Sequence, residues 1–237
     1  WIFLDVPSPA ASVWQFWAAA TRSRVGPTRG QRQEFATLEP AAGDAWLKVQ
    51  EVAAGGGVHL DLDVADPTAA AERAVALGAR VVHRVQGGYV VLRSPGGFVF
   101  CLTTWEGAGH QIRVGEADLL DQLCLSVDAE AFEAEVSFWA GLTGIAPVRG
   151  SREEFAVLPR PAGWPVRILV QRRQTPGGPG TGHPDFACAD RARTRAEHEA
   201  LGARHTGEGE RWSVMTAPGG QVYCLTDRRP ATGALSG

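Results

Sequence analysis

The sequence has a single lysine, no C-x-x-C pair, little methionine and no long apolar run. No apolar stretch approaches the ~20 residues that a membrane-spanning helix needs, and no signal peptide opens the chain. We therefore expect no contact with a membrane. The net charge of −3 creates no basic field, so nucleic acid is not an expected partner either.

The four cysteines lie singly in strand-like stretches, which indicates buried, reduced thiols in a cytoplasmic protein. The preference for arginine over lysine suggests a GC-rich bacterial gene and implies no mechanism. Of the 237 residues, 44% are hydrophobic and 21% are charged, which is ordinary for a globular protein. That length suits two domains of ~115 residues. Trp1 already lies in strand-like sequence, so we expect native residues before it.

An internal repeat organises the chain. RGQRQEFATL at 29–38 returns as RGSREEFAVL at 149–158, and SPGGFVFCLT at 94–103 returns as APGGQVYCLT at 217–226. The offset between matching residues drifts between 120 and 124, as small loop insertions would produce. The sequence is therefore a tandem duplication. We divide it into domain 1 (1–112), domain 2 (119–229) and a loose tail (230–237).

Each half divides again into two similar pieces. A short strand precedes apolar residues at helical spacing, and three alternating runs follow. In the second piece Asp66 fits the N-cap of a helix that ends before Gly78. In the first piece Ser8, followed by Pro9, fits the N-cap of a helix over 10–22. The sequence predicts an α+β fold of four βαβββ modules, near 1–53, 58–105, 121–173 and 183–226.

Three features together resemble the vicinal oxygen chelate superfamily. They are a Phe-Trp pair on the first helix of each half, H-x-D at the start of the second module and P-G-G before its last strand. This superfamily includes glyoxalase I, bleomycin- and fosfomycin-resistance proteins and extradiol dioxygenases. The sequence looks most like tandem actinobacterial glyoxalase-like domains. The resemblance implies two domains with cupped mixed sheets, and it leaves the activity to the site residues because the fold serves enzymes and pure binders.

Metal-using members of this superfamily hold one divalent ion with His, Gln or Glu at the first and last strands of each module, ending in Glu. In the N-terminal half these positions fall on Trp1, Ile2 or Phe3, then on Gln50, His59 and Cys101. In the C-terminal half they fall on Asp121 or Gln122, then on Gln171, His183 and Cys224. Both halves lack the closing carboxylate that a hard divalent ion favours. We therefore expect no cofactor, and the alternative is a divalent metal held by Gln122, Gln171, His183 and Cys224.

His59 and His183 each head a strand and share a face with an aspartate two residues later. Each histidine has three interpretations: a hydrogen bond to a neighbouring carboxylate or carbonyl, contact with an organic ligand, or metal ligation. The aspartates either orient the histidines or lie solvated at the mouth of the cavity. Strand aromatics either fill the core or stack on a flat ligand. The candidate ligand-binding residues are His59, His183, Gln50, Gln171, Asp61, Asp185, Trp212 and Tyr89.

Three functions remain open at this point. The first is a protein that binds a small organic molecule in a barrel cavity without a metal. The second is a metal-dependent lyase, isomerase or dioxygenase-type enzyme of the same superfamily, and the third is a non-catalytic scaffold. No Ser-His-Asp spacing, P-loop or dinucleotide motif favours another class of enzyme. The duplication predicts a monomeric pseudo-dimer or a homodimer.

Overall fold

The computed structural model describes residues 1–104, 115–161, 164–175 and 177–235, so the domain boundary expected at residue 112 lies outside it. The N-terminal half contains β1 (Ile2–Pro7), α1 (Ala11–Ala20), β2 (Ser23–Val25), β3 (Phe35–Pro40), β4 (Leu47–Val52), β5 (Gly57–Val64), α2 (Pro67–Ala76), β6 (Arg80–Arg84), β7 (Val90–Arg93) and β8 (Val99–Thr104). The C-terminal half contains β9 (Leu119–Val127), α3 (Phe132–Thr143), β10 (Phe155–Leu158), β11 (Arg167–Arg172), β12 (Thr181–Ala187), α4 (Arg191–Ala200), β13 (Arg204–Glu208), β14 (Trp212–Thr216) and β15 (Val222–Thr226).

Each half forms one continuous mixed sheet, so the modules pair within a half. The strand orders are β2-β3-β4-β1-β5-β8-β7-β6 and β10-β11-β9-β12-β15-β14-β13. The two modules of a half join where β1 runs antiparallel to β5, and β9 to β12. The second sheet has one strand fewer in the described residues, because the counterpart of β2 is reduced to a single bridge between Val148 and Val157.

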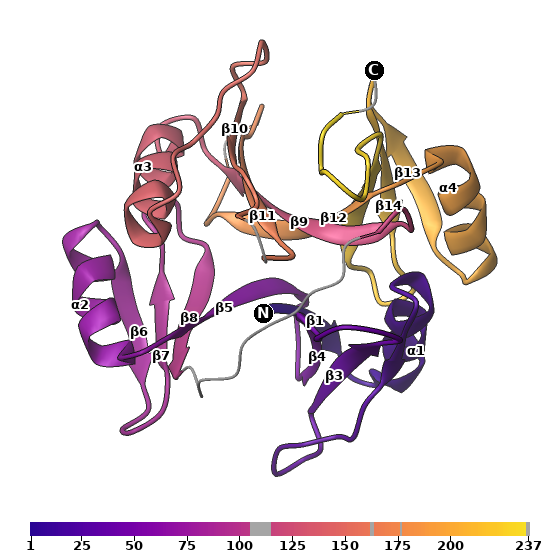
Figure 1. The fold of residues 1–237 in the computed structure, drawn as a ribbon. Coiled ribbons are helices and arrows are strands. Elements are labelled where there is room, and N and C mark those ends of the chain that lie inside the picture. The colour runs from indigo at the N-terminus through magenta and orange to yellow at the C-terminus, as the bar shows by residue number, and fades with distance from the viewer. Residues whose placement is uncertain (105–114, 162–163, 176, 236–237) are drawn as a thin grey trace.

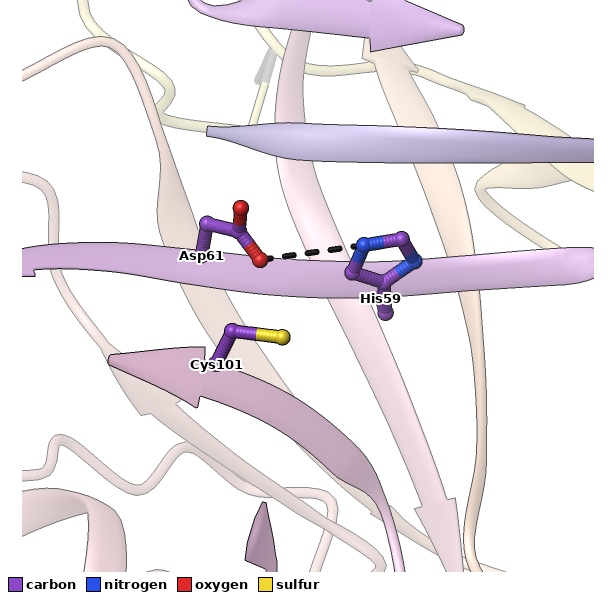
Figure 2. Close-up of side chains that lie close together, drawn as sticks. All are labelled: His59, Asp61 and Cys101. Atoms are coloured by element: carbon purple, nitrogen blue, oxygen red, sulfur yellow. Dashed lines mark ion pairs between the residues drawn. The ribbon is translucent and has the colours of Figure 1, made fainter. Parts of the chain in front are cut away.

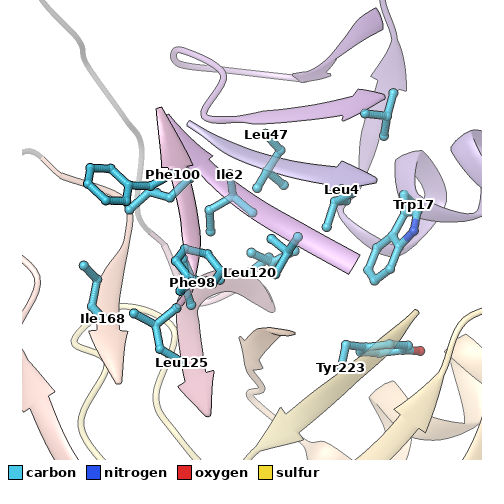
Figure 3. Packing of buried hydrophobic residues seen from close by; sticks show 14 of the residues in the cluster. Ile2, Leu4, Trp17, Leu47, Phe98, Phe100, Leu120, Leu125, Ile168 and Tyr223 are labelled. Carbon is cyan, nitrogen blue, oxygen red and sulfur yellow. The ribbon is translucent and has the colours of Figure 1, made fainter. Parts of the chain in front are cut away.

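The two curved sheets stack with their convex faces together, and the helices flank this sandwich in two pairs, α1 beside α4 and α2 beside α3 (Figure 1). The first helix of each half packs on the last strand of the other half. Trp17 on α1 meets Tyr223 on β15 with 5.3 Å between ring centroids (Figure 3). Trp139 on α3 meets Phe100 on β8 at 5.2 Å. The two halves therefore share one hydrophobic core.

Alternation along β5 gives the sheet its two different faces. Val58 and Leu60 are buried in the shared core, whereas His59 and Asp61 point to the opposite, concave face. The aliphatic residues of β1, including Ile2 and Leu4, fill the same core (Figure 3). The predicted orientation of β5 is thus confirmed.

The helix starts agree with the sequence in one module and differ in another. Asp66 caps α2, and its Oδ1 accepts hydrogen bonds from the backbone N–H groups of Thr68 and Ala69 at 2.8 and 3.0 Å. The cap expected at Ser8 is wrong, because α1 begins after Ala10, which makes no side-chain cap. Within the described residues, no helix has the length and apolar character needed to span a membrane.

The loose tail expected at 230–237 is instead held by hydrogen bonds over residues 230–235. Together with Arg228 and Arg229, we name these residues the tail segment. A bridge joins Arg228 to Leu235, and the Arg229 N–H donates to the Ala234 carbonyl at 2.8 Å. The carbonyl of Gly233 accepts a hydrogen bond from Arg167 of β11 at 2.9 Å. The chain therefore folds back over one end of the C-terminal sheet after β15.

A buried histidine in the shared core makes stability depend on pH. His198 on α4 lies among Phe16, Phe186 and Tyr223, and its Nδ1 is 3.0 Å from the Tyr223 hydroxyl. Burial lowers the pKa of His198 from 6.5 to about 4. Between these values the unfolded chain takes up a proton that the folded chain does not, so folding is progressively destabilised as the pH falls.

We expect the free energy of unfolding to drop by up to about 3 kcal/mol between pH 6.5 and 4 through His198 alone. Urea denaturation across this pH range measures the drop. The His198→Gln variant should show a correspondingly weaker pH dependence. An unchanged slope in that variant would rule out His198 as its source.

Candidate functional site

The two predicted histidines occupy equivalent places on the concave faces of the two sheets. His59 on β5 lies opposite Phe3 on β1, and His183 on β12 lies opposite Cys124 on β9. Because side chains alternate along a strand, these four groups point to the same side of their sheets. Each histidine is therefore at the centre of its concave face, on one of the two strands that join the modules.

The first-strand position of the C-terminal half is occupied by Cys124, which corrects the expectation of Asp121 or Gln122. A β-bulge between Asp185 and Phe186 changes the register of β12 against β9. Gln122 lies opposite Asp185, and the pair Pro184–Leu123 separates it from the pair of His183 and Cys124. A thiol therefore replaces the oxygen donor expected at this position.

In the N-terminal half, His59 is held on three sides. Its ring stacks on Phe3, with centroids 4.5 Å apart and planes inclined by 14°. Its Nδ1 lies 2.8 Å from Asp5 Oδ2, and its Nε2 lies 3.7 Å from Asp61 Oδ1 (Figure 2). The buried Asp61 Oδ1 accepts no hydrogen bond from the described residues. The ring is therefore fixed in place, and one carboxylate oxygen remains open to a donor.

In the C-terminal half, His183 lies among sulfur and oxygen atoms. Its Nε2 is 3.3 Å from Asp185 Oδ1 and 3.6 Å from Cys224 Sγ. The Cys124 thiol donates to Gln171 Oε1 at 3.3 Å. Asp185 is buried, and its Oδ1 accepts no hydrogen bond from the part of the chain that is described. Two thiols, an imidazole and a carboxylate thus gather around one point.

These thiols are protonated at neutral pH. Burial raises the pKa of Cys124 and of Cys224 well above the usual range, and the nearby Asp185 carboxylate raises both further. Burial and Asp61 raise the pKa of Cys101 in the same way. A protonated thiol is a weak donor and a poor nucleophile, so these cysteines are unsuited to nucleophilic catalysis.

A chain of polar contacts runs from His183 towards β11. Gln122 Nε2 donates to Asp185 Oδ2, and Gln122 Oε1 accepts from Arg167 Nε at 2.6 Å. One Asp185 oxygen is therefore occupied by Gln122, while the other faces His183. Both the nitrogen and the oxygen of the Gln122 side-chain amide are hydrogen-bonded, so Gln122 positions the Asp185 carboxylate.

The remaining candidates differ in what they contact. Trp212 on β14 meets Phe155 on β10 with 6.2 Å between ring centroids, and the Arg152 guanidinium lies over both rings. Because these strands lie towards opposite edges of the sheet, the contact closes the concave face into a barrel. Tyr89, at the matching repeat position, is 43% exposed. Gln50 lies half-buried beside Asp5 in the β1–β4 ladder.

Sequence reasoning missed several residues that shape the two sites. Phe3 and Asp5 alternate with buried residues of β1, so the pattern of residues 1–6 could have placed them beside His59. No comparable pattern marks Arg167 or Arg228, because arginine in a strand or after one is usually exposed.

The donors fit a metal in one half better than in the other. His59, Asp61 and Cys101 offer atoms within 4.8 Å of one another, but Phe3, which cannot ligate, lies opposite His59 on the first strand. In the C-terminal half Cys124, His183 and Asp185 lie equally close, and Cys224 Sγ adjoins His183. Two sulfurs, one nitrogen and one oxygen suit a thiophilic ion such as zinc more than an ion that prefers oxygen ligands.

A family model described as a glyoxalase-like domain matches the sequence twice, over residues 1–103 and 124–226. The two matches correspond to the two halves of the repeat. No curated protein sequence matches the chain.

Several solved structures share the fold across nearly the whole chain. A mutant of 4-hydroxymandelate synthase from Streptomyces coelicolor superimposes with a TM-score of 0.62 and 13% identity, covering 99% of this chain and 93% of that chain. The 2,3-dioxygenase LapB from Pseudomonas sp. KL28 gives 0.60 and 11%, covering 95% and 90%. A variant of homoprotocatechuate 2,3-dioxygenase from B. fuscum gives 0.63 and 13%, covering 98% and 72%. At such low identities the likeness concerns the fold alone.

Proposed function

Because the chain belongs to the glyoxalase-like domain family, within the vicinal oxygen chelate superfamily, we propose that it binds a small organic molecule without requiring a metal. One observation carries the proposal. Cys101 and Cys224 stand where metal-using members close their site with glutamate, and both are buried thiols whose pKa is raised above the usual range by burial. A thiol at this position lacks the permanent negative oxygen that a hard divalent ion favours, and an ion would have to displace its proton in order to bind.

The C-terminal barrel offers the contacts that such a ligand needs. The buried Oδ1 of Asp185 has no hydrogen-bond donor in the described residues, so it would accept from a hydroxyl or amide of a ligand that enters beside His183 Nε2. Trp212 and Phe155 supply an apolar wall on the same concave face. A mainly apolar site with a few convergent polar groups is typical of small-molecule binding.

A metal-dependent lyase, isomerase or dioxygenase-type enzyme is the second candidate. The four donor side chains around His183 favour it, and solved structures of similar fold include dioxygenases. The ion would lie on Cys124, His183, Asp185 and Cys224, and it would supply Lewis-acid chemistry to a bound substrate. In that case Gln122 would orient the Asp185 carboxylate from behind.

Metal analysis of untagged protein, purified without chelator, distinguishes the two candidates. We expect less than about 0.2 equivalents of any transition metal per chain, and no gain in thermal stability on adding zinc. The Cys124→Ser/Cys224→Ser variant serves as the matched control. A stoichiometric metal that this variant loses would favour the enzyme and contradict metal-free binding.

Native mass spectrometry and thermal-shift screening against small aromatic molecules then test binding itself. Ligands should raise the melting temperature of the wild type, and Asp185→Asn should weaken this effect for ligands that donate a hydrogen bond. If no co-purified or added organic molecule binds to either half, the remaining function is that of a non-catalytic scaffold.

A further inference from the structure

Three arginines gather where the tail segment crosses the end of the C-terminal concave face. Arg228 forms a two-point ion pair with the buried Asp121, at 2.8 and 2.7 Å. Arg160 Nη1 lies 3.7 Å from the same carboxylate. Within the described chain, no carboxylate lies at ion-pair distance from Arg167. The cluster therefore holds three guanidinium groups and one buried carboxylate, which Arg228 and Arg160 share.

The positive charge of this cluster exceeds what its carboxylates offset. Asp121 is fully buried and pairs at both oxygens with Arg228, and Asp185 reaches Arg167 only through the neutral amide of Gln122. Burial and, after it, the Arg228 charge lower the pKa of Arg167 to about 10. Arg167 is half-buried, and removing a guanidinium from water without an anion is costly, so an added negative charge would stabilise the site.

The tail segment supplies neutral oxygen atoms to two of these arginines. The Gly233 carbonyl accepts from Arg167 Nη1 at 2.9 Å, and the Ala231 carbonyl accepts from Arg160 Nη2 at 3.2 Å. The segment is a small loop closed on itself, in which the Gly233 N–H donates to the Arg229 carbonyl at 2.7 Å. The two tail carbonyls therefore occupy guanidinium N–H groups of Arg160 and Arg167 that could instead donate to the two oxygens of a carboxylate.

We propose that Arg160 and Arg167 form a binding site for the carboxylate of an organic acid, which the tail segment occupies in the absence of ligand. The inference rests on the proposed function and names its ligand class. A carboxylate makes charge-assisted, two-point contacts with guanidinium that are roughly twice as strong as neutral ones. The organic part of the ligand would extend along the concave face, where Gln122 and Asp185 connect Arg167 to His183.

Displacing the tail tests the site directly. Gly233 has a φ of 70°, which a β-branched residue adopts only with strain, so Gly233→Val should lift the tail segment. Benzoate and its neutral counterpart benzamide are titrated calorimetrically at low ionic strength. Hydrogen exchange at the Arg229 and Gly233 amides, whose hydrogen bonds close the segment, reports whether it has moved.

We expect Gly233→Val to bind benzoate about tenfold more tightly than the wild type does, and about tenfold more tightly than it binds benzamide. Adding Arg167→Gln, or Arg160→Gln if the first variant does not fold, should remove both differences. Arg149→Gln, at an exposed pair with Glu133, should leave benzoate binding unchanged.

Equal affinity for benzoate and benzamide in the displaced variant would overturn the inference, as would benzoate binding that survives both arginine substitutions. The results for neutral aromatic molecules distinguish failure of this inference from failure of the proposed function. If neutral aromatic molecules bind but acids are not preferred, only the carboxylate site is lost. If neither class binds at all, both proposals fall.

Discussion

Replacing Trp17 with alanine is expected to lower the free energy of unfolding by about 3–5 kcal/mol, because the side chain is fully buried in the core that the two halves share. Its ring meets Tyr223 of the other half, so part of the loss concerns the contact between halves. Urea denaturation followed by circular dichroism measures the change. Trp164→Ala is the control, since Trp164 is 49% exposed and should cost less than about 1 kcal/mol.

The equivalent tryptophans Trp17 and Trp139 differ by one hydrogen bond, and this difference allows a second comparison. The Trp139 indole N–H donates to the buried Glu135 Oε1 at 2.7 Å, whereas the Trp17 indole N–H has no partner in the described residues. Trp139→Phe leaves the Glu135 oxygen without its donor, so it should cost about 1–3 kcal/mol more than Trp17→Phe. Equal costs for the two variants would contradict a hydrogen-bonding role for Glu135.

Much of the fold could be predicted because the deciding signals are local. The repeat gave the four modules, and the Asp66 cap and Gly78 gave the limits of α2. Alternation placed His59 and Asp61 on the face away from the core. The glyoxalase-like domain matches and the shared fold of the solved structures confirm the predicted superfamily and architecture. These features depend on spacing along a few residues, which a single sequence contains.

The partners of the histidines could not be predicted with the same accuracy. Alternation assigns a side chain to a face, but it does not say which residue of the neighbouring strand lies opposite. The observed register of β9 against β12 puts Cys124 opposite His183 and Gln122 opposite Asp185, and a one-residue bulge beyond Asp185 shifts that register. The repeat also could not show that Asp5 holds His59 in one half, because Ser126 stands at the matching place in the other.

Long-range packing was equally invisible in the sequence. The Phe-Trp pairs on α1 and α3 predicted buried helix faces, but not that each pair packs on the last strand of the other half. The small and polar residues of the tail segment suggested a loose end. They instead accept hydrogen bonds from Arg160 and Arg167 through backbone carbonyls. Every residue has a backbone carbonyl, so the sequence pattern cannot predict such contacts.

Asparagine at position 121 is expected to destabilise the protein by about 3–5 kcal/mol, because Arg228 would remain charged and buried without its carboxylate. Burial raises the pKa of Asp121, and the arginines around it oppose that shift, which places this carboxyl in a strongly desolvated site. Urea denaturation at pH 7 measures the effect. The Glu133→Gln variant, at an exposed ion pair with Arg149, is the matched control and should change stability by less than about 1 kcal/mol.

A second substitution separates loss of the ion pair from loss of packing. In Asp121→Asn/Arg228→Met both charges are gone, so the double variant should be more stable than Asp121→Asn alone. The gain is expected because an unpaired buried guanidinium costs more than an apolar side chain of similar length. A double variant that is less stable than Asp121→Asn would show that Arg228 stabilises the protein chiefly through packing. The unpaired charge of Arg228 would then not explain why Asp121→Asn is destabilising.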